Sequence, residues 1–432
     1  MPFRRYPLEW LVLVLVAFAA LPPISLTGPQ DRTRYELTRH IVLHQTIRLE
    51  PGLFDRARYH GRTYSDKAPG MSFLAVPWFE LERGLGIAKA PTRWKEEGDW
   101  SLWLMRVLTS GPLFLSAVLV VGRLAEGIAA GTGAATAAIF GVATIAAPLA
   151  PTFFEHDAAG AFAVSSFALL VAGARRWTTA LAGFLAGTAV FFNYQSGLIA
   201  LVLFAYAIWR RRRDALLFVL GAVPPAVALG AYDWTAFGSP FRLSYRYVAN
   251  PYAERQRSGF FGIGFPTLHG LGEFLAGTRG LLVWSPVCIA AAAGLVLLWR
   301  RRLRAEALTA GAIVVLFAFV DAGYFLPYGG GSPGPRFFAA ALPFLALGLA
   351  PALARFRVPV LALGLVSVVT MTIQGLSWGV RLQTDTSWLP GKNDVMATTW
   401  MLLGLNRDAG AVIVLLCALG ALAVGSLAML RR

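Results

Sequence analysis

The sequence predicts an all-α polytopic membrane protein, a helical bundle of about 12 transmembrane helices. Of its 432 residues, 56% are hydrophobic and only 14% are charged, whereas soluble domains carry about 25% charged residues. The mean hydropathy is +0.59. The apolar residues fall in repeated blocks of about 17–24 residues, each long enough to cross roughly 30 Å of hydrocarbon. These three observations place the chain in a bilayer.

The apolar blocks define the expected spans, in chain order. The first follows Arg4 and Arg5, and we interpret it as an uncleaved first helix because no small-residue cleavage site precedes the polar loop. The expected spans cover 9–27, 101–122, 132–150, 157–174, 177–193, 196–209, 215–233, 280–299, 306–325, 337–354, 358–376 and 410–430.

The distribution of arginine predicts the orientation of these spans. With the N-terminus inside, the short loops on the same side hold Arg123, Arg175, Arg176, Arg210 to Arg213, Arg300 to Arg302, Arg304, Arg355, Arg357, Arg431 and Arg432. The short loops on the other side hold only Arg336. Because positive residues stay on the cytoplasmic side, we expect a multi-pass plasma-membrane protein with both termini cytoplasmic.

The spans divide the chain into alternating membrane and extracytoplasmic parts. The segment 70–86 is apolar but carries Pro77, Glu80, Glu82 and Arg83, so we expect an interfacial helix there. The expected parts are a first helix at 1–27, an extracytoplasmic loop at 28–100, helices at 101–233, a loop at 234–279, helices at 280–376 with a short outer loop at 326–336, a loop at 377–409 and a last helix at 410–432.

Charge and cysteine content exclude several classes of function. The net charge is +16, but the arginines cluster at the ends of apolar blocks, which indicates membrane topology and no nucleic-acid partner. Cys288 and Cys417 both fall in apolar spans, so neither a disulfide framework nor a cysteine metal site is expected. We expect membrane lipid as a partner.

The first outer loop carries an acid close to the membrane. Asp31 follows the first span, and the stretch from Asp31 to His44 has helical spacing. An intramembrane or boundary carboxylate is costly unless it is solvated or paired, which suggests a functional role. Alternatively, Asp31 stabilises the start of the following helix, because aspartate favours helix N-termini.

Two motifs in this loop resemble a known family. The first is Asp31-Arg32-Thr33-Arg34-Tyr35, and the second is Tyr64-Ser65-Asp66-Lys67-Ala68-Pro69. In order, spacing and topology they resemble the first periplasmic loop of GT-C glycosyltransferases, in particular the lipid A aminoarabinose transferase and protein O-mannosyltransferase branch. The resemblance covers the first hundred residues well and the rest in outline. It implies a GT-C-like bundle with its active site on the extracytoplasmic face.

The resemblance also implies a reaction. A sugar carried on a polyprenyl phosphate would be transferred, with inversion, to a hydroxyl of a glycan, lipid or protein acceptor. Such a transfer needs a general base for the acceptor and cations for the departing phosphate. No cofactor is expected beyond this donor substrate, and a divalent metal stays possible although His44, His60 and His269 show no ligand spacing.

The same resemblance assigns the catalytic acids. Asp31 matches the family's catalytic acid. The next residue is Arg32, where the family usually has glutamate, and Glu36 is therefore a rival as base. Asp66, in the second motif, is a third catalytic candidate.

The second motif supplies the phosphate-binding candidates of this loop. Lys67 takes the place of the lysine that the family uses for the carrier phosphate, although a lysine beside an aspartate is commonly only a solvated ion pair. We add the nearby candidates for substrate binding, which are Tyr64, Arg34, Arg58 and Arg62.

Two later segments extend the candidate site. The loop at 234–279 is rich in Tyr, Arg and Gly, and Arg242, Arg246 and Arg255 are candidates for phosphate binding. Its aromatic residues fit a membrane-interface loop equally well. The segment Tyr328 to Phe338 combines glycines and prolines with Arg336 at the start of a span, a pattern that suits an anion. We therefore nominate Arg336 for the carrier phosphate, the alternative being a plain interfacial turn.

Two further sites stay open. Glu155-His156-Asp157 begins a span, where three adjacent residues cannot all converge on one ion, so a helix cap is the favoured interpretation. Asp321, late in a span, is a functional candidate because charges are rare in membrane helices.

Two other functions compete with glycosyl transfer. A transporter or flippase for a lipid-linked sugar predicts ionisable residues in the middle of spans and broken helices, whereas the polar residues of this chain gather on the outer side. A non-catalytic accessory protein with a GT-C-like framework is the third possibility, and Arg32 is the departure that favours it.

Overall fold

The computed structural model describes residues 7–24, 28–88, 100–173, 175–300, 303–377 and 395–430. Most of the expected loop at 377–409 lies outside these residues, as do Arg4, Arg5, Arg431 and Arg432. The structure is 74% helical with almost no sheet, which confirms the all-α class.

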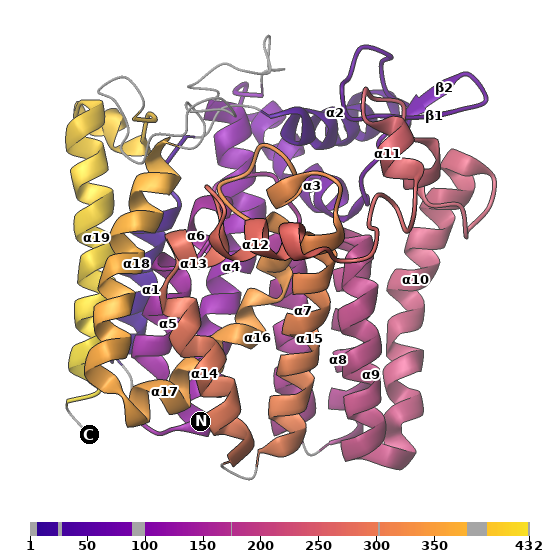
Figure 1. Ribbon diagram of the computed structural model, residues 1–432. Helices are drawn as coiled ribbons and strands as arrows, with labels where there is room; N and C mark the ends of the chain where they lie inside the picture. The colour runs from indigo at the N-terminus through magenta and orange to yellow at the C-terminus, as the bar shows by residue number, and fades with distance from the viewer. Residues whose placement is uncertain are drawn as a thin grey trace.

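Long helices run side by side in one bundle (Figure 1). Nine of the expected spans coincide with one helix each, and the other three with two or three consecutive shorter helices. These helices are α1 (Pro7–Ala20), α4 (Trp100–Ile128), α5 (Gly133–Val142), α6 (Ala146–Leu149), α7 (His156–Ala172), α8 (Arg176–Phe192), α9 (Gly197–Arg211), α10 (Ala215–Phe237), α13 (Leu281–Trp284), α14 (Val287–Arg300), α15 (Arg304–Gly323), α16 (Leu342–Ala346), α17 (Leu349–Arg355), α18 (Arg357–Ser377) and α19 (Arg407–Ala428).

The number of membrane crossings is not settled by helix length. Five helical stretches of the described chain are long and apolar enough to cross a bilayer, or six if one bent pair counts as a single span. In that pair, α12 (Leu268–Ala276) and α13 meet α14 at 95°. The break falls at Pro286, which cannot donate a backbone hydrogen bond to the preceding turn. The total of about 12 crossings therefore stays a prediction.

The polar elements gather at one end of the bundle, which we call the loop end. It carries α2 (Pro29–His44), α3 (Gly70–Gly84), the hairpin of β1 (Ala57–Tyr59) and β2 (Arg62–Tyr64), and α11 (Ala253–Arg257). Figure 1 shows α2 lying across this end, while α1 begins and α19 ends at the opposite end. The helix expected at 70–86 is α3, and it packs against α2 through the hydrogen bond from Thr38 Oγ1 to the Ser72 carbonyl, 3.0 Å long.

The β-hairpin was not expected from the sequence. Its strands pair antiparallel, with Ala57 opposite Tyr64. His60 and Gly61 form the two-residue turn with φ of 47° and 74°, the positive values that tight hairpins require. Ala57 also bridges to Val248, so the two polar segments that are far apart in the sequence form one layer above the bundle.

Small residues bring the helices of the core together. A Cβ atom on Gly183 of α8 would lie 1.8 Å from the Phe218 carbonyl oxygen of α10, and one on Gly221 of α10 would lie 1.8 Å from the Ala180 carbonyl oxygen. In a bilayer the hydrophobic effect does not drive helices together, because lipid tails are as apolar as the side chains. Membrane helices associate instead through the close packing that such small residues allow. This packing fixes the helices whose ends carry the site.

Candidate active site

Lys67 lies buried just beyond β2 and forms ion pairs with two carboxylates. Its Nζ is 2.9 Å from Asp66 Oδ2 and 3.5 Å from Asp55 Oδ2. Burial by itself lowers the pKa of Lys67, but the charges of Asp55 and Asp66 outweigh it, so the pKa is raised and the ammonium stays charged. For Asp66, burial raises the pKa to about 6 even though Lys67 acts in the opposite direction.

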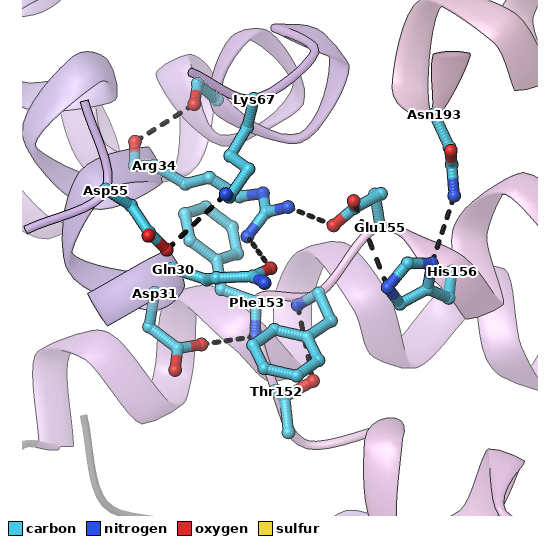
Figure 2. Close-up of polar contacts among 12 residues, drawn as sticks. Gln30, Asp31, Arg34, Asp55, Lys67, Thr152, Phe153, Glu155, His156 and Asn193 are labelled. Carbon is cyan, nitrogen blue, oxygen red and sulfur yellow. Dashed lines mark hydrogen bonds and ion pairs between the residues drawn. The ribbon is translucent and has the colours of Figure 1, made fainter. Parts of the chain in front are cut away.

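Arg34 joins α2 to the start of α7. Its side chain is fully buried and forms an ion pair with Glu155, while its Nη1 donates to Gln30 Oε1 at 3.1 Å. Figure 2 shows the guanidinium between these two partners. Burial alone would raise the pKa of Glu155, but the charge of its ion-pair partner Arg34 acts in the opposite direction, and the pKa is lowered to about 2. Glu155 is therefore ionised at neutral pH.

His156 is the first residue of α7, and its ring contacts the Asn193 side chain. Its Nδ1 lies 3.0 Å from Asn193 Nδ2. Its Nε2 is buried, lies 4.0 Å from Glu155 Oε1, and has no hydrogen-bond partner in the described ranges. Figure 2 shows the ring between Asn193 and Glu155.

Arg336 lies far from Lys67 in the sequence, in the last third of the chain. It begins the 3₁₀ helix η6 (Arg336–Ala340), and its guanidinium lies 5.4 Å from the centre of the Phe154 ring and 5.3 Å from that of Phe337. No carboxylate of the described chain forms an ion pair with it. Gly329, with φ of 75°, leaves room for it, because a Cβ there would lie 2.6 Å from Arg336 Nε.

These groups meet at one pocket at the loop end. The pocket encloses about 420 Å³ of empty space, including its open mouth. Its lining mixes cationic, anionic and aromatic side chains, which can bind a charged headgroup and the face of a sugar ring. The lining residues are Gln30, Lys67, Glu155, His156, Gln195, Tyr245, Gln256, Phe261, Tyr324, Arg336 and Phe337.

The structure thus brings together four of the residues nominated from the sequence. Lys67 and Arg336 line the pocket. Arg34 and Asp66 lie directly behind it, each paired with a lining residue.

Asp31 lies next to this site without lining it. Its Oδ2 accepts from the backbone N–H of Gly28 at 3.0 Å and its Oδ1 from that of Phe153 at 2.8 Å. Arg106 Nη2 lies 3.4 Å from Oδ2. This is the helix-stabilising arrangement that the sequence offered as the alternative to catalysis. Glu36 pairs with Arg39 at 3.2 Å and does not line the pocket either.

The remaining nominated residues lie away from the pocket. Tyr64 is buried against Phe237, with 5.5 Å between ring centres, and Arg242 Nη1 donates to Tyr59 at 2.6 Å. These contacts stabilise the hairpin layer. The other nominated arginines are exposed at the surface, namely Arg58, Arg62, Arg246 and Arg255.

Several pocket residues carry little signal in the sequence. Gln30 and Tyr245 line the pocket but belong to no recognisable motif, and the same is true of Asp55, which pairs with Lys67 behind it. Only the tertiary contacts reveal these three residues. Glu155 and His156 stand out as an acid–histidine pair, but the pattern alone favours a helix cap. Among the described residues, no three His, Cys, Asp or Glu side chains lie close enough together to hold a metal ion.

Three buried aspartates complete the polar features of the site's surroundings. Asp157, Asp233 and Asp321 are buried, and neither carboxylate oxygen of any of them has a hydrogen-bond partner among the described residues. Each lies in the first or last turns of its helix, α7, α10 or α15, at the loop end. These three buried carboxyl groups therefore lie at the loop end of their helices.

Comparison with known proteins identifies the fold. No protein-family model matches the sequence, and no curated protein is detectably similar to it. The fold is similar to that of ArnT from Cupriavidus metallidurans in the apo state, with a TM-score of 0.55 and 17% identity over 98% of this chain and 76% of that chain. The same protein bound to undecaprenyl phosphate gives a TM-score of 0.55 and 18% identity over the same shares.

A second similarity involves a longer protein. The archaeal oligosaccharyltransferase AglB from Archaeoglobus fulgidus, in complex with an inhibitory peptide and a dolichol-phosphate, matches with a TM-score of 0.54 and 12% identity. The match covers 99% of this chain but only 56% of AglB. All of these are GT-C membrane glycosyltransferases. At such low identity the similarity establishes the fold, and it confirms the GT-C-like bundle expected from the first loop.

Proposed function

Since the chain has the GT-C membrane fold, we propose that it is a glycosyltransferase that transfers a sugar from a polyprenyl-phosphate carrier to an acceptor hydroxyl on the extracytoplasmic face. One observation carries the proposal. Lys67 and Arg336, nominated separately from distant segments, line the same pocket. The acceptor is a glycan, lipid or protein.

The charge of the pocket suits a phosphate. Lys67 is balanced by Asp55 and Asp66, whereas Arg336 forms no ion pair with any carboxylate of the described chain. A guanidinium with its donors open binds phosphate oxygens well. ArnT in its complex binds undecaprenyl phosphate and AglB binds a dolichol-phosphate, and both ligands are polyprenyl phosphates of the proposed class.

The chemistry follows from the leaving group. When the bond between the anomeric carbon and the phosphate breaks, negative charge grows on the phosphate, and Lys67 and Arg336 stabilise it. Attack by the acceptor from the opposite side inverts the anomeric carbon in a single displacement. A carboxylate accepts the acceptor's proton. The arginine-rich loops at the other end of the bundle support an extracytoplasmic location for the pocket.

The distribution of buried acids favours transfer over transport. A flippase would be expected to carry ionisable groups along the middle of its spans. Here Asp157, Asp233 and Asp321 all lie in helix turns at the loop end. This arrangement supports chemistry at one surface.

The proposal is tested by binding of polyprenyl phosphate to the purified full chain in detergent. Each charge-assisted hydrogen bond contributes about 1.5–3 kcal/mol, so Lys67→Ala and Arg336→Ala should each weaken binding by about 10- to 100-fold. Arg213→Ala, a change of an exposed arginine in the α9–α10 connection, is the matched control and should bind as the wild type does. Unchanged affinity in both pocket variants would contradict the proposal.

A further inference from the structure

Two atoms of the pocket are available to a substrate, and one is a hydrogen-bond acceptor while the other is a hydrogen-bond donor. Glu155 uses its Oε2 for Arg34, which leaves Oε1 available, and His156 Nε2 lies 4.0 Å from Oε1. His156 Nε2 is the second open atom, buried and unpartnered within the described chain. Both residues line the pocket.

The contacts of Asn193 determine where His156 carries its proton. Asn193 Oδ1 accepts from the backbone N–H of Gln195 at 3.0 Å. The amide is thereby oriented so that its Nδ2, a donor only, faces His156 Nδ1 at 3.0 Å. Nδ1 must then be the acceptor, so the neutral ring carries its hydrogen on Nε2. His156 therefore presents a fixed N–H donor to the pocket.

The spacing of the two open atoms fits one hydroxyl group. Glu155 Oε1 accepts and His156 Nε2 donates, and they lie 4.0 Å apart. A single oxygen can lie within about 2.8 Å of both. A hydroxyl both donates and accepts, whereas a phosphate oxygen only accepts and would be repelled by Glu155. The phosphate-binding cations Lys67 and Arg336 line the same pocket, so the hydroxyl would lie close to the departing phosphate.

Building on the glycosyltransferase function proposed above, we infer that Glu155 and His156 hold the acceptor hydroxyl, with Glu155 as the general base. In the transfer, the acceptor oxygen forms a bond to the anomeric carbon. The bond from that carbon to the phosphate oxygen breaks, and its electron pair leaves with the polyprenyl phosphate. The hydroxyl proton moves to Glu155 Oε1. His156 Nε2–H positions the oxygen and stays protonated throughout.

The ionisation of Glu155 suits this role. The Arg34 guanidinium opposes the effect of burial and the pKa lies at about 2, so Glu155 is ionised and can accept a proton at any physiological pH. It is a weak base, but the acceptor oxygen becomes strongly acidic once its bond to the anomeric carbon forms. Asp31, in contrast, already has both oxygens engaged by backbone N–H groups.

The inference is tested by separating donor binding from turnover. The full chain is expressed in host membranes, which supply hydroxyl acceptors, and release of polyprenyl phosphate from radiolabelled polyprenyl-phosphate sugars is measured at saturating donor. Polyprenyl-phosphate affinity is measured on the same purified variants. Glu155→Gln should reduce release by at least about 100-fold and leave affinity within threefold, because glutamine still accepts from Arg34. Glu254→Gln, an exposed acid of α11, is the matched control.

His156 is tested by two substitutions and by its tautomer. His156→Phe should reduce release by about 10-fold or more, whereas His156→Gln, which keeps a side-chain N–H donor, should recover much of it. His269→Gln, at an exposed position, controls for histidine loss. Selective ¹⁵N labelling of histidine should show one resonance of the Nε2–H tautomer that His156→Gln removes.

The outcomes distinguish this inference from the proposed function. If Lys67→Ala and Arg336→Ala lose binding but Glu155→Gln keeps more than a tenth of wild-type release, the function stands and Glu155 is not the base. Equal losses in His156→Phe and His156→Gln, or an Nδ1–H tautomer, would overturn the role of His156. If Asp31→Asn abolishes release while Glu155→Gln does not, Asp31 is the base. A wild-type chain that neither binds polyprenyl phosphate nor releases it from any donor would overturn both proposals.

Discussion

The cations in and behind the pocket pair with carboxylates, with one exception that marks the anion site. Arg34 pairs with Glu155, and Lys67 pairs with Asp55 and Asp66. Burying a charge is costly unless a partner compensates it. Arg336 alone among these pocket cations has no such partner in the described chain, only aromatic faces. It can therefore contribute its charge to a ligand.

The Arg34–Glu155 pair should matter strongly for stability. Arg34→Met leaves the Glu155 carboxylate buried without its partner, which costs about 3–5 kcal/mol. The double variant Arg34→Met/Glu155→Gln removes the isolated charge and should recover most of this loss. Denaturant unfolding of the purified chain in detergent measures both. If the double variant is as unstable as the single one, the pair is not the cause.

The same pair predicts a dependence of stability on pH. The pKa of Glu155 is lowered from 4.5 to about 2 in the fold, so ionised Glu155 stabilises the folded state at neutral pH. This contribution should be constant above about pH 5 and disappear as the pH falls from 4.5 toward 2. The difference in unfolding free energy between wild type and Glu155→Gln, followed with pH, measures it. A change centred near pH 7 would contradict the assigned pKa.

At the scale of elements, α2 is a polar helix that is buried on most of its sides. Its buried residues include Thr33, Thr38 and His40, and hydrogen bonds such as that from Thr33 Oγ1 to the Asp55 carbonyl, 2.7 Å long, satisfy them. The helix is therefore a rigid support. It places Gln30 in the pocket lining and Arg34, one turn further on, behind the pocket against Glu155.

Asp31 is expected to stabilise this helix. Asp31→Ala removes the acceptor of two backbone N–H groups and the carboxylate beside buried Arg106, and should cost about 2–5 kcal/mol. Polyprenyl-phosphate affinity of the folded protein should stay within threefold of wild type. Thermal unfolding in detergent and ligand binding are measured on the same preparation. A large loss of affinity without a loss of stability would assign Asp31 to the binding site instead.

The contact between α8 and α10 depends on glycine. Gly183→Ala places a methyl group against the Phe218 carbonyl and should destabilise the bundle by about 1–3 kcal/mol. Gly311→Ala in α15 is the matched control, because a Cβ there meets nothing within 4 Å. Thermal unfolding should separate the two variants clearly. Equal behaviour would mean that the helices can move apart at no cost.

For the whole molecule, the sidedness of the loop end is the decisive question. Arg58 is exposed on the hairpin. The variant Arg58→Cys should react with an impermeant thiol reagent in intact cells, because the loop end is expected to be extracytoplasmic. The variant Arg213→Cys, in the connection between α9 and α10 at the opposite end of the bundle, should react only after the cells are permeabilised. Cys288→Ala and Cys417→Ala provide the background. The reverse pattern would place the pocket in the cytosol.

Local patterns along the chain were enough to predict most of the long helices, the membrane class and two of the pocket's cations. Apolar runs of membrane-spanning length have few alternatives to a helix, and the motif at Lys67 and the glycine-rich segment at Arg336 signal their chemistry locally. The breaks, such as that at Pro286, were hidden inside apolar runs because the hydropathy of a bent span equals that of a straight one.

Only the tertiary structure decided which acid faces the pocket. Asp31 and Gln30 are neighbours on α2, and the rotation of about 100° per residue sends one to the Phe153 backbone and the other to the pocket. Glu155 reaches the site only because α7 begins beneath α2. Nothing in the local pattern encodes how two helices are rotated against each other, since that rotation is set by packing across the whole bundle.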